Sequence, residues 1–176
     1  MAKTLELFRK AAPALRAPVA EDGADIWELV RDCKPLDENS MYCNLVQCDH
    51  FSDTCVVAEL DGEIVGWISA YVLPKDPDTL FVWQVAVSQK ARGLGLGTQM
   101  LNALLKRKAC ADVKRMQTTI TADNDASWAL FRKFAKGNQA DIGSEAHFKK
   151  TEHFRELHST EHMVTIDLGE RMRKAA

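Results

Sequence analysis

A run of alternating glycines between a strand and a helix constrains this chain more than any other feature of its sequence. The run is Arg92-Gly93-Leu94-Gly95-Leu96-Gly97, and it follows the apolar segment 79–87 and opens the helical pattern 96–109. Glycine accepts positive φ angles and lets a ligand approach the backbone closely. The first amides of a helix lack intrahelical partners and lie at the positive end of its dipole. The run therefore predicts an anion site suited to a pyrophosphate.

The run matches other known glycine-rich motifs less well. A Walker loop needs Gly-Lys followed by Ser or Thr, and that sequence is missing here. A dinucleotide fingerprint needs a repeated strand-helix-strand half and an acidic residue about 20 positions further on, and neither follows. An ordinary strand-to-helix turn stays open as an alternative, although such a turn rarely needs alternate glycines.

Apolar periodicity and turn residues divide the rest of the chain into short strands and helices. The Asp61-Gly62 pair is the strongest hairpin signal, and the nearly continuous apolar character of residues 79–87 predicts burial on both faces. Residues 137–158 are too polar to assign. The predicted elements are a strand between Pro13 and Pro18, helices at 22–34 and 39–48, strands at 54–60, 63–73 and 79–87, a helix at 96–109, a strand at 116–121, a helix at 124–136 and a strand at 161–168.

Length and charge favour one domain with a small-molecule substrate. A chain of 176 residues with 46% hydrophobic content predicts a single domain over residues 13–170, after a flexible tail over 1–12. The 23 basic and 25 acidic residues nearly cancel, so no strong field attracts nucleic acid or a membrane. No apolar run approaches a membrane span of about 20 residues and no secretory signal is visible, so we expect a cytoplasmic protein.

The cysteines and histidines do not suggest a metal or a disulfide framework. The 5 cysteines form no Cys-x-x-Cys pair, and we expect buried, reduced thiols. His158 and His162 are four positions apart, but His162 begins a segment that alternates at the strand period. We therefore expect no metal site.

The glycine turn resembles the coenzyme A signature of the GCN5-related N-acetyltransferases (GNAT). The signature Gln/Arg-x-x-Gly-x-Gly/Ala is matched by Arg92, Gly95 and Gly97, and the predicted order of elements is similar over nearly the whole chain. The resemblance implies an α/β (α+β) GNAT fold with a mixed central sheet and helices on both faces. It also implies acetyl-coenzyme A as co-substrate, held by Val85 and Val87 at the strand end and by Arg92, Gly93, Gly95 and Gly97 in the turn.

A second family element is an asparagine followed by a helix with an aromatic residue, matched by residues 124–131. The resemblance implies that Asn124 and Ser127 contact the coenzyme A arm, although Asn124 also suits a simple helix cap. Many members have a tyrosine at the position of Phe131, where it protonates the leaving thiolate. Because phenylalanine has no proton to donate, another group or water must supply it here.

Further segments resemble one branch of the family, the enzymes that acetylate L-2,4-diaminobutyrate for synthesis of the compatible solute ectoine. The match spans roughly residues 16–168, and Lys34 and the segment 137–157 depart from it. The segments that carry the likeness are 35–40, 50–51 with 54–55, 76–87, and 118–120 with 123–124.

An acceptor with two ammonium groups and one carboxylate needs carboxylates and hydrogen-bond donors around it. In the GNAT fold the loop between the first two helices and the connection before the last strand form the acceptor side, which implies the substrate-binding residues Asp37, Asn39, Tyr42, Trp83, His158 and Glu161. The charged residues also suit a solvated surface. Trp83, two positions before Val85 and predicted on the same face, suits either a substrate wall or the core.

The resemblance implies direct acetyl transfer, in which the γ amine attacks the thioester. A backbone amide near Val85 would polarise the carbonyl, and Glu161 with His158 would remove a proton from an ammonium whose pKa is about 10. A family member acting on a polyamine, an aminoglycoside, another amino acid or a protein N-terminus is an alternative, as is a non-catalytic acyl-coenzyme A sensor. The family also suggests a homodimer.

Overall fold

The computed structural model describes residues 12–34 and 36–169. Within this part of the chain a mixed seven-stranded sheet has the order β1-β2-β3-β4-β5-β7-β6. Most of the predicted tail and residue 170 lie outside the described residues. The elements are β1 (Ala14–Arg16), α1 (Gly23–Asp32), α2 (Met41–His50), β2 (Val56–Leu60), β3 (Glu63–Leu73), β4 (Asp76–Val87), α3 (Leu96–Leu105), β5 (Arg115–Thr121), α4 (Asp125–Gly137), β6 (Asp141–Phe148) and β7 (Glu161–Asp167).

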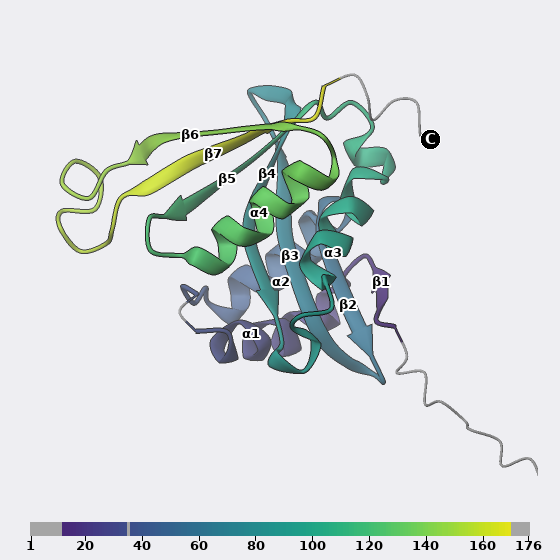
Figure 1. Ribbon diagram of the computed structural model, residues 1–176. Coiled ribbons are helices and arrows are strands. Elements are labelled where there is room, and N and C mark those ends of the chain that lie inside the picture. Colours follow the sequence, from purple (N-terminus) through teal and green to yellow (C-terminus); the bar gives the residue numbers. More distant parts are fainter. Residues whose placement is uncertain (1–11, 35, 170–176) are drawn as a thin grey trace, which may run out of the picture.

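Helices cover both faces of the sheet, as predicted (Figure 1). On one face α1 and α2 enclose a buried cluster that includes Ile26, Val30 and Trp67. On the other face α3 and α4 enclose a larger cluster that includes Leu104 and Phe134. Burial of these apolar side chains on both faces is the main stabilising contribution to such a layered fold. No helix among the described residues is long and apolar enough to cross a membrane.

Local signals in the sequence set several of the turns and helix ends. Asp61 and Gly62 have φ angles of 52° and 82°, so the β2–β3 hairpin has the left-handed turn that this pair favours. The Ser40 side chain accepts a hydrogen bond from the amide of Cys43 and caps α2. Asn124 caps α4 in the same way, through the amide of Ser127.

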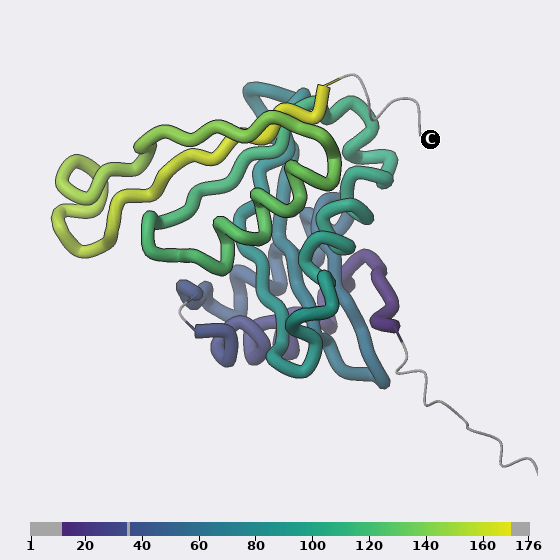
Figure 2. The backbone as a smooth tube through the Cα atoms, viewed as in Figure 1, coloured from purple at the N-terminus to yellow at the C-terminus, as the bar shows by residue number. Residues whose placement is uncertain are grey.

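Several predicted boundaries were wrong, and β6 was missed. β4 begins at Asp76 rather than 79, and α3 ends at Leu105 rather than 109. Beyond α3, Arg107 donates a hydrogen bond of 3.0 Å to the carbonyl of Ser52, which ties this turn to the start of β2. All eight residues of β6 are exposed, so neither face of the strand is buried and burial imposes no continuous apolar face that would mark it in the sequence. The hairpin of β6 and β7 extends from the body of the protein (Figure 2).

A β-bulge at Trp83 changes the face of the residues that follow it in β4. Ser69 pairs with Gln84 and Ala70 with Val82, so Trp83 is the extra residue. Val85 packs against the α3–α4 cluster, as Val82 does, whereas Trp83 lies beside Tyr71 with ring centroids 6.5 Å apart. The prediction that Trp83 shares a face with Val85 was therefore wrong, whereas burial of the strand on both faces is confirmed, because Val82 belongs to the α3–α4 cluster and Ala86 to the α1–α2 cluster. Trp83 is 50% exposed.

The parallel strands β4 and β5 pair only over a short stretch. Residues 79–81 pair with 115–117, and both strands then continue without pairing to each other. Figure 1 shows β4 and β5 separating beyond this point. The sheet therefore has an opening between the far half of β4 and the far half of β5, bordered by backbone groups that have no partner strand on that side.

Candidate active site

Two adjoining cavities lie at this opening. The first, of about 470 Å³, is lined by Leu36, Asp37, Asn39, Trp83, Gln84, Val85, Thr118, Thr119, Ile120, Thr121, Asp123, Asn124, Ser127, Phe131, Leu157, His158, Ser159 and Glu161. The second, of about 430 Å³, lies beside the glycine turn and includes Val87, Arg92, Gly93, Gly95, Gly97 and Lys133 in its lining. Leu36, Val85, Asn124 and Ser127 border both. A molecule that occupies both cavities therefore passes Val85.

The glycines of the turn have different structural requirements. Gly93 and Gly95 have φ angles of 79° and 72°, and Gly95 is the N-cap of α3 in the left-handed conformation. Their need for glycine is conformational, because an added Cβ would meet only the Nζ of Lys133, 3.8 Å from Gly95. Gly97 is different, since a Cβ there would lie 3.0 Å from Leu130 of α4. Left-handed residues at a helix N-terminus direct amides outward and fit a pyrophosphate.

The end of β4 forms the wall between the two cavities. Val85 and Val87 both line the cavity at the glycine turn. The exposed side chain of Arg92 is attached to the strand end, because its Nε donates a hydrogen bond of 3.2 Å to the carbonyl of Val87. The Cys33 thiol donates to the same carbonyl over 3.4 Å. The strand end is thus fixed from two sides beside the unpaired edge.

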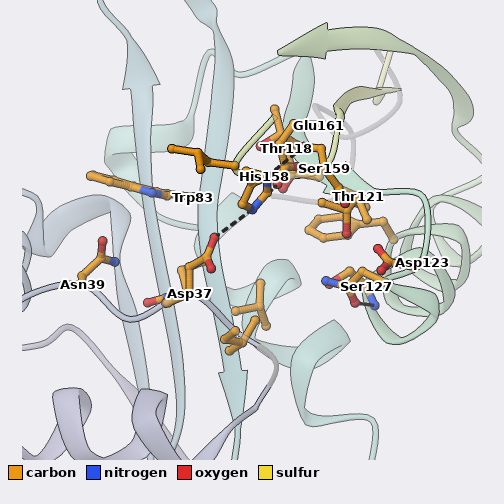
Figure 3. Close-up of a pocket in the computed structure, with 18 residues that line it drawn as sticks. Asp37, Asn39, Trp83, Thr118, Thr121, Asp123, Ser127, His158, Ser159 and Glu161 are labelled. Carbon is orange, nitrogen blue, oxygen red and sulfur yellow. Dashed lines mark hydrogen bonds and ion pairs between the residues drawn. The ribbon is translucent and has the colours of Figure 1, made fainter. Parts of the chain in front are cut away.

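His158 connects two carboxylates across the first cavity. Its Nε2 lies 3.2 Å from Oδ2 of Asp37 and 3.8 Å from Oε1 of Glu161. Figure 3 shows Asp37 and His158 pointing toward each other. Its Nδ1 lies 2.8 Å from the carbonyl oxygen of Ser159, which can only accept, so Nδ1 carries a proton. Nε2 faces carboxylates, and it therefore also donates.

These contacts stabilise the imidazolium form of His158. Its pKa is raised, chiefly by the hydrogen bond to Ser159 and then by the negative charges of Asp37 and Glu161, against an opposing effect of burial. The ring also lies against Phe154, with centroids 4.6 Å apart. The site therefore holds a fixed positive charge between two acids to a higher pH than an ordinary histidine would.

Glu161 is the more buried of the two acids, with 16% of its side chain exposed against 86% for Asp37. Burial raises its pKa because the charged form is poorly solvated, while His158 and a hydrogen bond from Thr119 oppose that rise. Oε2 of Glu161 is buried and has no hydrogen-bond partner among the described residues. A carboxyl oxygen left in this state is suited to a ligand that brings its own N–H group.

The loop that carries Asp37 is held by two distant side chains. Nε2 of Gln84 donates a hydrogen bond of 2.8 Å to the carbonyl of Asp37, and Nε1 of Trp27 donates one of 3.1 Å to the carbonyl of Asn39. Sequence reasoning missed Gln84, because only the bulge at Trp83 turns its side chain toward this loop. Asp123 also lines the cavity and was not among the predicted site residues.

The structure brings most of the predicted site residues together, with one exception. Tyr42 is 74% exposed on α2 and lines neither cavity. Phe131 is buried at 2% exposure in the wall of the first cavity. Within the described residues, no group of His, Cys, Asp and Glu side chains is arranged to hold a metal ion.

The model of the acetyltransferase (GNAT) family matches residues 23–135. The chain belongs to the GNAT family. The resemblance found in the sequence is thereby confirmed, and the sheet with helices on both faces is the GNAT fold.

The proteins that this chain resembles within the family are named for one particular acetyltransferase activity. L-2,4-diaminobutyric acid acetyltransferase from Methylotuvimicrobium alcaliphilum is 53% identical over 152 residues, which cover 86% of this GNAT chain and 88% of that protein. The enzyme of the same name from Vibrio cholerae is 47% identical over 164 residues, 92% of this chain and 94% of that one. The structure of diaminobutyrate acetyltransferase EctA from Paenibacillus lautus, in complex with its substrate L-2,4-diaminobutyric acid and coenzyme A, has a TM-score of 0.83 and 38% identity over 89% of this chain and 96% of that chain.

Replacement of Gly95 tests the assignment of the glycine turn to the GNAT co-substrate. Because Gly95 has a φ of 72°, Gly95→Val strains the turn and displaces its amides. We expect the KM for acetyl-coenzyme A to rise at least about tenfold and far more than the KM for the amine, in steady-state assays. Gly62→Val, also at positive φ but in the β2–β3 turn, is the control. Equal changes in both KM values for Gly95→Val would contradict the assignment.

Proposed function

We propose that the protein is an acetyl-coenzyme A:L-2,4-diaminobutyrate N-γ-acetyltransferase that serves ectoine biosynthesis and thus osmoprotection. The observation that carries this proposal is the pair of acids around His158, in a cavity that adjoins the glycine turn at Val85. Carboxylates in that position suit an acceptor with two ammonium groups. The names of the similar GNAT enzymes and of the EctA complex support the same acceptor.

The co-substrate is proposed to lie in the second cavity and to reach the first past Val85. Acetyl-coenzyme A, when bound, supplies an acetyl group activated as a thioester. Gly93, Gly95 and Gly97 are proposed to hold the pyrophosphate and Val85 and Val87 to pair with the pantetheine arm, while Arg92 fixes the turn to the strand end. Asn124 and Ser127 border both cavities and are proposed to contact the pantetheine arm. Because Oδ1 of Asn124 already accepts the capping hydrogen bond from Ser127, its Nδ2 is proposed to make the contact with the arm.

The acceptor is proposed to be held by its two nitrogens at the two acids that face Nε2 of His158. Asp37, the more exposed acid, is proposed to bind the α-ammonium, and Trp83 and Asn39 to border it. Glu161 is proposed to take a proton from the γ-ammonium, oriented by His158. Because the pKa of Glu161 is raised, its carboxylate is a stronger base than an ordinary glutamate once it is ionised.

The remaining steps are positioning and charge stabilisation. A backbone amide near Val85, on the unpaired edge of β4, is proposed to polarise the thioester carbonyl. Holding the amine beside that carbonyl can supply about 7–11 kcal/mol of the barrier. Phe131 donates no proton to the thiolate, so another group or water does so.

The product decides between diaminobutyrate and other acceptors. The protein with acetyl-coenzyme A and diaminobutyrate should release free thiol and give a product whose fragmentation in a mass spectrometer places the acetyl group on the γ nitrogen. Putrescine, lysine and ornithine are the comparison amines. A higher kcat/KM with any of these amines than with diaminobutyrate, or an acetyl group on the α nitrogen, would contradict the proposal. Absence of thiol release with every amine would favour a non-catalytic sensor.

The assembly and location are proposals of the same kind. We propose a single domain over residues 13–170 that acts in the cytoplasm as a homodimer. The exposed β6 supports a dimer, because its outer edge has no partner strand among the described residues and displays Ile142 and Phe148. A mass of one copy in light scattering would count against the dimer.

Replacement of Asp37 tests its role as binding group. Asp37→Asn keeps the shape and removes the charge, so we expect the KM for diaminobutyrate to rise about 10- to 150-fold, as for loss of a hydrogen bond to a charged group. The kcat should change little. Asp25→Asn, at an exposed position in the first turn of α1, is the matched control. A wild-type KM for diaminobutyrate in Asp37→Asn, measured at saturating acetyl-coenzyme A, would show that Asp37 is a solvated surface residue that does not bind the substrate.

Replacement of Glu161 tests its role as base. Glu161→Gln should lower kcat by about 10²- to 10⁴-fold, the usual contribution of general base catalysis. Because only the ionised form of Glu161 accepts a proton and its pKa is raised, wild-type activity should increase as pH rises through that pKa. In Glu161→Gln the rise should move to higher pH, toward the pKa of the free ammonium.

The assay for Glu161 starts at acidic pH and extends to about pH 10, near the pKa of a free alkyl ammonium. Glu145→Gln, on exposed β6, is the matched control, and thermal unfolding reports any folding defect. An unchanged pH profile in folded Glu161→Gln would exclude this residue as the base.

A further inference from the structure

We propose that Lys133 of α4 binds the pyrophosphate of the co-substrate together with the glycine turn, so that it sets the preference for a phosphate-bearing donor. The proposal rests on the proposed use of acetyl-coenzyme A. Its starting point is a distance: Nζ of Lys133 lies 3.8 Å from the position that a Cβ on Gly95 would occupy. Gly95 is the left-handed N-cap of α3, where the outward amides gather.

Lys133 is the cation of this cavity whose charged group has no hydrogen-bond or ion-pair partner among the described residues. Lys34, Arg92 and Lys133 all line it. Lys34 forms an ion pair with Glu38, and Nε of Arg92 donates to the carbonyl of Val87. Among the residues that the structure describes, no carboxylate pairs with Lys133. An ammonium that is unpaired within the protein and lies over a nest of amides faces the place where an anion would bind.

The close approach of α3 and α4 explains how Lys133 reaches this position. Gly97 has no Cβ, and one built there would lie 3.0 Å from Leu130. Lys133 follows Leu130 by three positions and therefore lies on the same side of α4, about one turn further on. The third glycine of the motif thus has an indirect function, because it lets α4 come near enough to place an ammonium over the second glycine.

The charges at this point all have the same sign. The amides of the turn, the positive end of the α3 dipole and the ammonium of Lys133 converge on one cavity wall. A pyrophosphate offers several acceptor oxygens, and lysine binds phosphate as a point charge without a fixed orientation. Lys133 is exposed, so its contribution should decrease as salt concentration rises.

Donors of different length test the proposal. Lys133→Ala should raise the KM for acetyl-coenzyme A by about tenfold with little change in kcat. The KM for S-acetyl-pantetheine, which has neither pyrophosphate nor nucleotide, should stay at the wild-type value. Acetyl-dephospho-coenzyme A retains the pyrophosphate and should show the same rise as acetyl-coenzyme A. Lys133→Arg should restore most of the loss, and Lys136→Ala, one turn further along α4, should behave as wild type.

Any of three other results would overturn the proposal. Equal effects on acetyl-coenzyme A and S-acetyl-pantetheine would mean that the substitution disturbs α4 rather than a phosphate contact. An effect on acetyl-coenzyme A that is missing with acetyl-dephospho-coenzyme A would place Lys133 at the 3′-phosphate instead. No effect on any donor would remove Lys133 from the site.

A binding measurement separates this proposal from the proposed reaction. Isothermal titration of wild type and Lys133→Ala with free coenzyme A and with pantetheine needs no acceptor and no turnover. We expect the Kd for coenzyme A to rise by the same factor of about ten, more at low salt than at high salt, with no change for pantetheine. Failure of acetyl transfer with a retained difference in coenzyme A binding would reject the proposed reaction alone. An unchanged Kd for coenzyme A would reject the role of Lys133.

Discussion

The early separation of β4 from β5 is the constraint on which the active site depends. Parallel pairing over residues 79–81 and 115–117 holds the two strands together at one end, and the bulge at Trp83 comes just after it. Backbone groups beyond that point have no strand partner across the opening, so a ligand can supply their hydrogen bonds. Both cavities lie along this opening, and Val85 lies where they meet.

The charges of the first cavity depend on segments that are far apart in the chain. Asp37 comes from the loop after α1, whereas His158 comes from the connection before β7 and Glu161 is the first residue of β7. The carbonyl of Ser159 keeps His158 protonated at Nδ1, and the two acids favour a second proton at Nε2. Burial distinguishes the two acids, because it raises the pKa of Glu161 whereas the side chain of Asp37 is 86% exposed.

The glycine turn shows that one motif can serve several physical purposes. Gly93 and Gly95 supply backbone conformations, whereas Gly97 supplies space for Leu130 of α4. The packing of α4 against α3 then determines which side chains reach the turn, and Lys133 is one of them. Substitutions in α4 can therefore change the surroundings of the turn without any change in the glycines.

The sequence by itself determined the family, the order of most elements, the glycine turn and the Asp61-Gly62 hairpin, because these depend on neighbours in the chain or on short repeats. It also named His158 and Glu161, through resemblance rather than geometry. Only the tertiary structure decided the exposed strand β6, the bulge at Trp83, the hydrogen bond from Gln84 and the position of Lys133. The physical reason is that each of these results from packing or pairing between distant segments, which leaves no local pattern of apolar residues, caps or turn residues to read.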